Sequence, residues 1–251
     1  MTQNTRLGLL SSNQLKLIAL IAMTLDHIGK QLLPQYPILQ IIGRLAFPLF
    51  AYMIAEGCKY TRNRKRYFYT IFIIGFLCQI VYFFAMELLY LSVLITFSLS
   101  ILIIFAIDYA IKPIGEWSDM VKQYGTYKNI AIIAARCILP IIIISVVVYS
   151  CEVLPYILWE YYFDIDYGIW GVLMPVAIYY GKGKLSKLVL SAIMITLLAM
   201  SIEGIQWYSL FALITLLLYN GRRGKLNMKN LFYVYYPLHL VVIYGIYLLI
   251  Q

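Results

Sequence analysis

The chain has 251 residues, of which 63% are hydrophobic and 12% are charged, and its formal net charge is +9. A mean hydropathy of +0.83 excludes a water-soluble globular domain, because such a domain needs a polar coat that this composition does not provide. We therefore expect a single integral-membrane domain over residues 1–251.

Apolar runs long enough to cross a bilayer recur along the chain. A transmembrane helix needs about 20 mainly apolar residues, and its backbone groups must be satisfied within the helix. The runs predict an all-α, polytopic helix bundle with about nine spans, at residues 15–33, 37–57, 67–87, 91–111, 130–149, 167–181, 185–201, 205–220 and 231–250. The sixth span is short and contains glycine.

The charged residues are divided between alternate loops of this topology. All Lys and Arg residues except Lys30, Arg44 and Arg136 fall at residues 6–16, 59–66, 112–128, 182–187 and 222–229. The charges in the intervening loops are acidic. Because basic residues gather on the cytoplasmic side of a membrane, we expect a cytoplasmic N-terminus and an external C-terminus. Topology thereby accounts for the net charge, and we expect no nucleic-acid partner.

The first span contains three ionisable side chains, Asp26, His27 and Lys30, in the stretch LKLIALIAMTLDHIGKQLL. Ionisable groups at membrane depth are costly and by default functional. Asp26 and Lys30 are four residues apart and can pair on one helix face. His27 lies about 100° around the helix from Asp26, so a carboxylate that orients His27 must come from another span. The alternative is a histidine that only packs.

The second and last spans each place a polar residue beside a proline. Pro48 removes the hydrogen bond to the Arg44 carbonyl and can kink the second span, and Pro237 acts in the same way before His239. At a rise of about 1.5 Å per residue, Arg44, His239 and His27 lie in the central and outer parts of the bilayer. If the three spans are neighbours, these side chains line one cavity.

A basic loop follows the second span in the stretch EGCKYTRNRKRY. One interpretation is positive-inside anchoring to anionic lipid. The other is a clamp for the phosphates of a cytosolic donor, because arginine forks suit phosphate oxygens. For this second interpretation the candidate residues are Glu56, Thr61, Arg62, Arg64, Lys65 and Arg66.

The stretch DIDYGIWGVLMP places Asp166 and Tyr167 at an outer edge, where they are candidates for contact with substrate. Gly168 and Gly171 allow close helix approach. The alternative for Tyr167 is an interfacial belt residue.

The cysteines are Cys58, Cys78, Cys137 and Cys151, and no two of them have CxxC spacing. This pattern suggests neither a disulfide framework nor a zinc site. We expect no metal.

Together, the stretches LKLIALIAMTLDHIGK, IGRLAFPLFAYMIAEGCKYTRNRKRY, DYGIWGVLMP and YYPLHL resemble the TraX family, named for a conjugation protein implicated in N-terminal acetylation of F-pilin. The likeness covers the chain in outline and is most specific over residues 1–67. It is carried by Asp26, His27, Arg44, Pro48, Glu56, Gly57, Thr61, Arg62, Asp166, Gly168, Gly171, Pro237 and His239. In the fourth span, Ser92 and Ser100 stand where the pattern has an asparagine and a glycine.

The resemblance implies a multi-pass acyltransferase of the bacterial cytoplasmic (inner) membrane, and we expect an acetyltransferase that uses acetyl-CoA. The basic loop would hold the CoA phosphates, and His27 would deprotonate an amine or hydroxyl of an acceptor such as a peptide N-terminus or a glycan. Arg44 would stabilise the oxyanion. His239 would be a second base, a donor to the thioester oxygen or an acetyl shuttle. The rival interpretation is a proton-coupled transporter or flippase, for which buried ionisable residues are equally natural.

Overall fold

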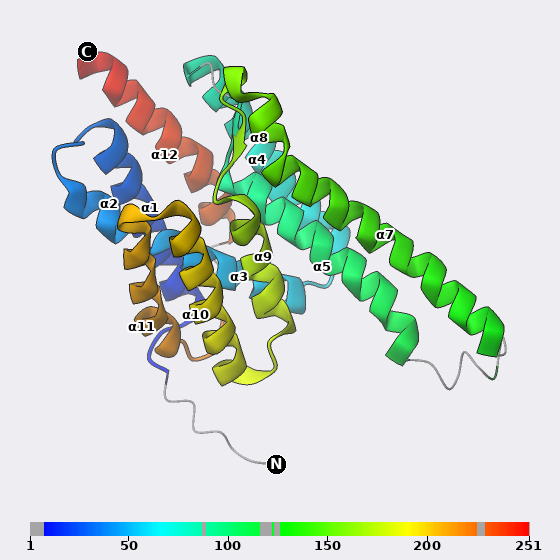
Figure 1. Ribbon diagram of the computed structural model, residues 1–251. Coiled ribbons are helices and arrows are strands. Elements are labelled where there is room, and N and C mark those ends of the chain that lie inside the picture. Colours follow the sequence, from blue (N-terminus) through cyan, green and yellow to red (C-terminus); the bar gives the residue numbers. More distant parts are fainter. Residues whose placement is uncertain (1–7, 87–88, 116–121, 123–125, 225–228, 251) are drawn as a thin grey trace. The chain divides into compact units, whose positions relative to one another are not determined.

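The computed structural model describes residues 8–86, 89–115, 122, 126–224 and 229–250 of the chain (Figure 1). The chain divides into two compact units. The first unit comprises Met1–Gly57 and Ala177–Gln251, and the second comprises Cys58–Val176. Segments from both ends of the sequence thus meet in the first unit.

The first unit is built around α1 (Ser12–Gln31), which packs against α2 (Pro37–Gly43) and α12 (Lys229–Ile250). Ser11 begins α1 with a capping box, in which its hydroxyl accepts from the Gln14 backbone and the Gln14 side chain accepts from the Ser11 backbone. Gly43 allows α2 to approach α1 closely, because a Cβ at this position would overlap the side chain of Asp26. The chain therefore brings the start of the second expected span against the polar part of the first.

The second expected span is interrupted at Arg44 and Leu45, between α2 and α3 (Ala46–Tyr60). Pro48 lies in the first turn of α3, where its missing N–H removes no hydrogen bond that a regular helix needs. The expected distortion next to Pro48 is thus a break in the helix at Arg44. By contrast, α12 continues without interruption through Pro237.

The eighth expected span, 205–220, is not a continuous α-helix. It consists of the 3₁₀ helix η2 (Gly204–Phe211) followed by α11 (Ala212–Leu217). The preceding helix α10 (Gly183–Ile202) ends at Glu203, which has φ 61° and is followed by Gly204 with φ 57°. This left-handed turn starts η2 in a tighter winding, in which the backbone N–H of Gln206 donates to the Glu203 carbonyl at 3.2 Å.

The second unit contains the long helices α4 (Arg64–Met86), α5 (Val93–Gly115) and α7 (Thr126–Glu152), with α5 packed against both of the others. A short segment after α7 holds α8 (Leu154–Ile157), η1 (Trp159–Tyr161) and β2 (Asp164–Ile165). β2 pairs in parallel with β1 (Tyr90–Leu91), so that Tyr90 lies opposite Asp164. The helix α9 (Gly168–Tyr180) begins in this unit and ends in the first.

Among the described residues, five helical segments are long and apolar enough to cross a membrane: Pro37–Tyr60, which joins α2 and α3, and Val93–Lys112, Thr126–Glu152, Gly183–Ile202 and Leu231–Ile250. The segments Gly168–Tyr180 and Gly204–Leu217 are apolar but shorter. In the part of the chain that the structure describes, the regular structure is helical apart from one pair of two-residue strands. The expectation of an all-helical fold is therefore confirmed, and these five helices are candidate membrane spans.

Candidate functional site

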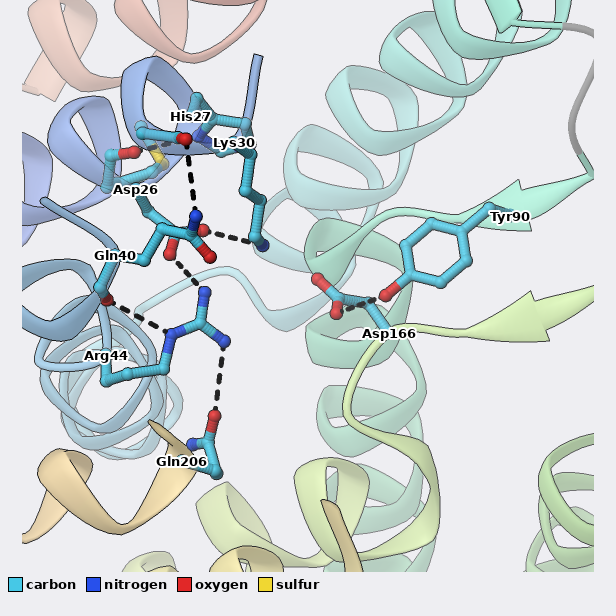
Figure 2. Close-up of polar contacts among 10 residues, drawn as sticks. Asp26, His27, Lys30, Gln40, Arg44, Tyr90, Asp166 and Gln206 are labelled. Carbon is cyan, nitrogen blue, oxygen red and sulfur yellow. Dashed lines mark hydrogen bonds and ion pairs between the residues drawn. The ribbon is translucent and has the colours of Figure 1, made fainter. Parts of the chain in front are cut away.

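A buried ion pair joins α1 to the break in the second span. The Arg44 guanidinium contacts the Asp26 carboxylate, and both side chains are 9% exposed. The ammonium of Lys30 also contacts Asp26, at 2.7 Å, but the Lys30 side chain is 48% exposed (Figure 2). The pairing of Asp26 with Lys30 across one helical turn follows the sequence prediction, and Arg44 is the more deeply buried partner.

Two further hydrogen bonds fix the orientation of Arg44. Its Nη1 donates to Oε1 of Gln206 at 3.3 Å, and its Nε donates to the backbone carbonyl of Gln40 at 3.4 Å (Figure 2). The Gln40 side chain in turn donates to the Gly29 carbonyl at 3.3 Å. The guanidinium is thus held on several sides in a region of low dielectric constant, where its charge acts more strongly than in water.

The histidine next to Asp26 is oriented by its own helix. Nδ1 of His27 lies 2.8 Å from the Met23 carbonyl. A carbonyl can only accept, so Nδ1 carries the proton and Nε2 of the neutral ring keeps its lone pair. His27 therefore forms no dyad with Asp26, as the helix geometry predicts. The orienting group is a backbone carbonyl, in place of the carboxylate expected from another span.

The second histidine lies beside the first. The His239 ring on α12 is edge-on to the His27 ring, with 5.0 Å between centroids and 74° between planes. Nδ1 of His239 lies 3.1 Å from the Tyr235 carbonyl, so Nε2 is again the lone-pair nitrogen. Within the described residues, this buried Nε2 has no hydrogen-bond partner. The two imidazole rings are thus in contact, and Nε2 of each ring is not hydrogen-bonded to the backbone of its own helix.

Tyr235 fixes α12 against α1 at this level. Its ring stacks on His239 with 5.5 Å between centroids and 5° between planes. Its hydroxyl lies 2.7 Å from Oγ1 of Thr24, which donates its own hydrogen to the Leu20 carbonyl. The Tyr235 hydroxyl is therefore the donor in the contact with Thr24. This bond and the stacking hold the His239 ring in place.

The first unit thereby brings together all of the residues that the sequence nominated for catalysis, which are Asp26, His27, Arg44 and His239. The condition for this cluster, that the first span neighbours both the second and the last, is met by the packing of α1 on α2 and α12.

Glu56 occupies a different position in the same unit. Its carboxylate forms an ion pair with Lys187 of α10, and the two side chains are 12% and 7% exposed. The ammonium of Lys187 also lies 5.8 Å from the centroid of the Tyr52 ring. In this structure the Glu56 carboxylate neutralises a lysine, and its role in binding a donor stays a prediction.

The basic loop belongs to the second unit. Asn63 caps α4 by accepting from the Arg66 backbone at 2.9 Å, and Thr61 donates to the Asn63 carbonyl at 3.2 Å. Arg64 contacts Asp108 at 2.6 Å and lies 4.8 Å from the centroid of the Phe105 ring. The loop residues with exposed cationic side chains besides Arg64 are Lys59, Arg62, Lys65 and Arg66.

Asp166 is held by the segment that follows α4. Its carboxylate accepts from the Tyr90 hydroxyl at 2.6 Å (Figure 2). Its backbone carbonyl accepts from the Thr96 hydroxyl, and its backbone N–H donates to the Leu91 carbonyl. Burial and the neighbouring carboxylate raise the pKa of Tyr90 well above its usual range, so the phenol stays protonated and donates. Tyr167 follows in a left-handed conformation, with φ 65°. These bonds anchor the turn before α9, and contact of Asp166 and Tyr167 with substrate stays a prediction.

Sequence reasoning missed two buried polar residues of the first unit, Gln206 and Lys187. Lys187 reads as one of several orientation charges at 182–187, and only its position two residues inside the expected span 185–201 distinguishes it. Gln206 stands near the start of an otherwise apolar segment, and the structure buries it to 1% exposure. Across the described parts of the chain, no group of three or more His, Cys, Asp or Glu residues could hold a metal ion.

Comparison with known proteins gives one family and two partial relatives. The family model described as TraX protein matches residues 11–247. Probable fimbrial assembly protein FimC, serogroup H1, of Dichelobacter nodosus is 37% identical over 76 residues, which are 29% of this chain and 31% of that protein. Uncharacterized protein RP591 of Rickettsia prowazekii (strain Madrid E) is 42% identical over 66 residues, which are 26% of this chain and 25% of that protein. No solved structure matches.

Proposed function

This chain belongs to the TraX family, and from that premise we propose that it is an integral-membrane acyltransferase that moves an acetyl group from acetyl-CoA to an amine or hydroxyl of an envelope acceptor. The proposal is carried by two features of the first unit. Each of two neighbouring histidines keeps a lone pair on Nε2, and the same unit contains a buried guanidinium whose orientation is fixed. Acyl transfer needs these two elements, a base for the nucleophile and a positive charge for the carbonyl oxygen.

His27 is the general base of this proposal. Its Nδ1 is held by the Met23 carbonyl, which fixes the ring and leaves Nε2 to accept a proton from the acceptor. His239 lies close enough to share in binding the acceptor or to relay the proton. A histidine suits this task because general-base efficiency is greatest for groups that titrate near the working pH.

Arg44 stabilises the negative charge that develops on the carbonyl oxygen. Asp26 provides the buried counter-charge, and the bonds to Gln206 and the Gln40 carbonyl fix the plane of the guanidinium. Because Asp26 contacts both Arg44 and Lys30, the local charge of these three side chains is positive. A preorganised positive charge of this kind stabilises an oxyanion without further rearrangement.

The exposed cations Arg62, Lys65 and Arg66 suit the phosphates of the donor. Bound acetyl-CoA would supply an activated thioester carbonyl. Arg64 is a weaker candidate, because Asp108 and Phe105 already engage its guanidinium. Anionic lipid headgroups remain the competing ligand of the same residues.

The Dichelobacter nodosus relative is named as a probable fimbrial assembly protein, and this name favours a subunit of a surface fibre as the acceptor. We extend the proposal to a multi-pass protein of the bacterial inner membrane with about nine spans and a cytoplasmic N-terminus. In this topology the basic loop at 59–66 faces the cytosol, where CoA is available.

Substitutions of His27 test the proposal. His27→Asn keeps a side-chain donor near the Met23 carbonyl, whereas His27→Gln places an amide near the position of Nε2, and neither variant can act as a base. In proteoliposomes supplied with acetyl-CoA and candidate acceptor peptides, we expect both variants to lose about 10²- to 10⁴-fold in the release of free CoA. Normal CoA release by His27→Asn would show that His27 acts only through its structural hydrogen bond to the Met23 carbonyl and is not the base. Proton-coupled uptake of solute by the wild type, without CoA release, would favour the transporter.

A further inference from the structure

Gln206 has one polar atom that the fold leaves unsatisfied. Arginine can only donate, so the amide atom that faces Nη1 of Arg44 is the oxygen, and the other end of the amide is Nε2. Gln206 is 1% exposed, and its Nε2 has no acceptor among the described residues. A buried amide with two unused N–H groups is unfavourable in the free protein and favours a ligand that accepts them.

The backbone before Gln206 is held in a conformation that L-amino acids rarely adopt. Glu203 has φ 61° and ψ −164°, a region that is populated almost only by glycine. Gln206 lies in the first turn of η2, and η2 packs against both α10 and α2. An uncommon backbone turn thus places Gln206 beside Arg44.

The polar atoms that lack partners in this unit are complementary to the two reactants of an acyl transfer, the acyl carbonyl of the donor and the nucleophile of the acceptor. The buried Nε2 of Gln206 needs an acceptor, and the buried Nε2 of His239 needs a donor. Nε2 of His27 carries a lone pair beside the His239 ring. A carbonyl oxygen supplies the first, and the N–H or O–H of a nucleophile supplies the second. A simple anion would satisfy Gln206 and Arg44 but would offer the histidines no hydrogen.

We propose that Gln206 is a second oxyanion donor, which contacts the acyl carbonyl of the donor through Nε2 while its Oε1 holds Arg44. This inference rests on the proposed acyltransferase function. It assigns a catalytic contact to Gln206, and it makes the carbonyl oxygen, as well as the phosphates, a feature by which the protein recognises its donor.

In the proposed step, a lone pair of the acceptor nitrogen or oxygen forms a bond to the carbonyl carbon, and its proton passes to Nε2 of His27. The carbonyl π electrons move onto oxygen, where Gln206 and Arg44 stabilise the charge. This electron pair then re-forms the carbonyl while the carbon–sulfur bond breaks. The thiolate leaves with the bonding electrons and takes up the proton, and nothing is oxidised or reduced.

Three variants separate the two ends of the amide. Gln206→Met removes the donor and the acceptor, whereas Gln206→Glu keeps an acceptor for Arg44 and lacks the donor. Gln79→Met is the matched control, because the buried amide of Gln79 also has no hydrogen-bond partner among the described residues but lies on α4, in the second unit. All are compared with the wild type in proteoliposomes, after the amount of folded protein has been equalised.

We expect Gln206→Met and Gln206→Glu to lower kcat by about 10²- to 10³-fold and to raise the KM for acetyl-CoA by up to about tenfold, and Gln79→Met to stay near the wild type. Activity of Gln206→Met near that of the wild type would overturn the inference. In Gln206→Glu the new carboxylate also offsets the positive charge of Arg44, so the loss in this variant is interpreted together with the loss in Gln206→Met.

A binding measurement covers the case in which a variant is unstable. The wild type should bind S-acetonyl-CoA, a ketone that cannot transfer its acyl group, about tenfold more tightly than S-propyl-CoA, which lacks the carbonyl oxygen. If the wild type transfers acetyl groups but binds the two analogues equally tightly, the role of Gln206 is refuted and the acyltransferase function is not. A wild type that neither transfers acetyl groups nor binds either analogue would refute the proposed function as well.

Discussion

Replacing Asp26 by asparagine tests the ion pair on which the candidate site is built. The side chains of Asp26 and Arg44 are both 9% exposed, so Asp26→Asn leaves a buried guanidinium without its counter-charge. Removal of one partner of a buried pair costs about 3–5 kcal/mol, because the remaining charge stays desolvated. The contact with Lys30 adds little, since the Lys30 side chain is 48% exposed and such pairs contribute at most about 1 kcal/mol.

The assay is thermal unfolding of the purified protein in one detergent. We expect Asp26→Asn to lower Tm by on the order of 10 °C and Lys30→Gln to lower it by about 2 °C or less. The double variant Asp26→Asn/Arg44→Gln should be more stable than Asp26→Asn alone, because it removes both charges and the two sites are coupled. Equal effects of Asp26→Asn and Lys30→Gln, or additive effects in the double variant, would refute the buried pair.

Three other predictions follow from named contacts. Replacing Arg62 and Arg66 by glutamine should raise the KM for acetyl-CoA about tenfold or more, whereas Arg64→Gln should change it less because Asp108 engages Arg64; an unchanged KM in the first variant would reduce the loop to an orientation signal. Tyr235→Phe should cost about 1 kcal/mol of stability and keep most activity, since the stacking on the adjacent histidine persists; a loss of activity as large as that of the base variants would contradict this role. In a cysteine-free background, a cysteine at 62 should resist membrane-impermeant labelling of intact cells and one at 160 should react; the reverse pattern would invert the topology.

The helices could be predicted because the pattern that specifies them is local. Long apolar runs place α1, α4, α5, α7, α10 and α12, and the proline at 48 marks the break at Arg44. The 3₁₀ winding of η2 could not be predicted in this way, because it follows from the left-handed turn at Glu203 and from packing on α10 and α2. Apolar content alone does not distinguish a 3₁₀ helix from an α-helix.

The candidate site was only partly predictable for the same reason. Asp26, His27, Arg44 and His239 stand out because ionisable groups are rare in apolar runs. Their pairing depends on which helices are neighbours, and depth along a span does not specify this. Lys187 and Gln206 were missed because one resembles an orientation charge and the other is uncharged, and only the packing of separate helices reveals their burial beside Glu56 and Arg44.

The most direct test of the account is product analysis after incubation of the purified protein, in proteoliposomes, with isotopically labelled acetyl-CoA and a candidate acceptor peptide. Mass spectrometry should find the labelled acetyl group on a peptide amine or hydroxyl, in amounts equal to the free CoA released, and the product should be lost in His27→Gln. Labelled peptide formed equally well by His27→Gln, or no acetylated product with any acceptor amine or hydroxyl, would contradict the account.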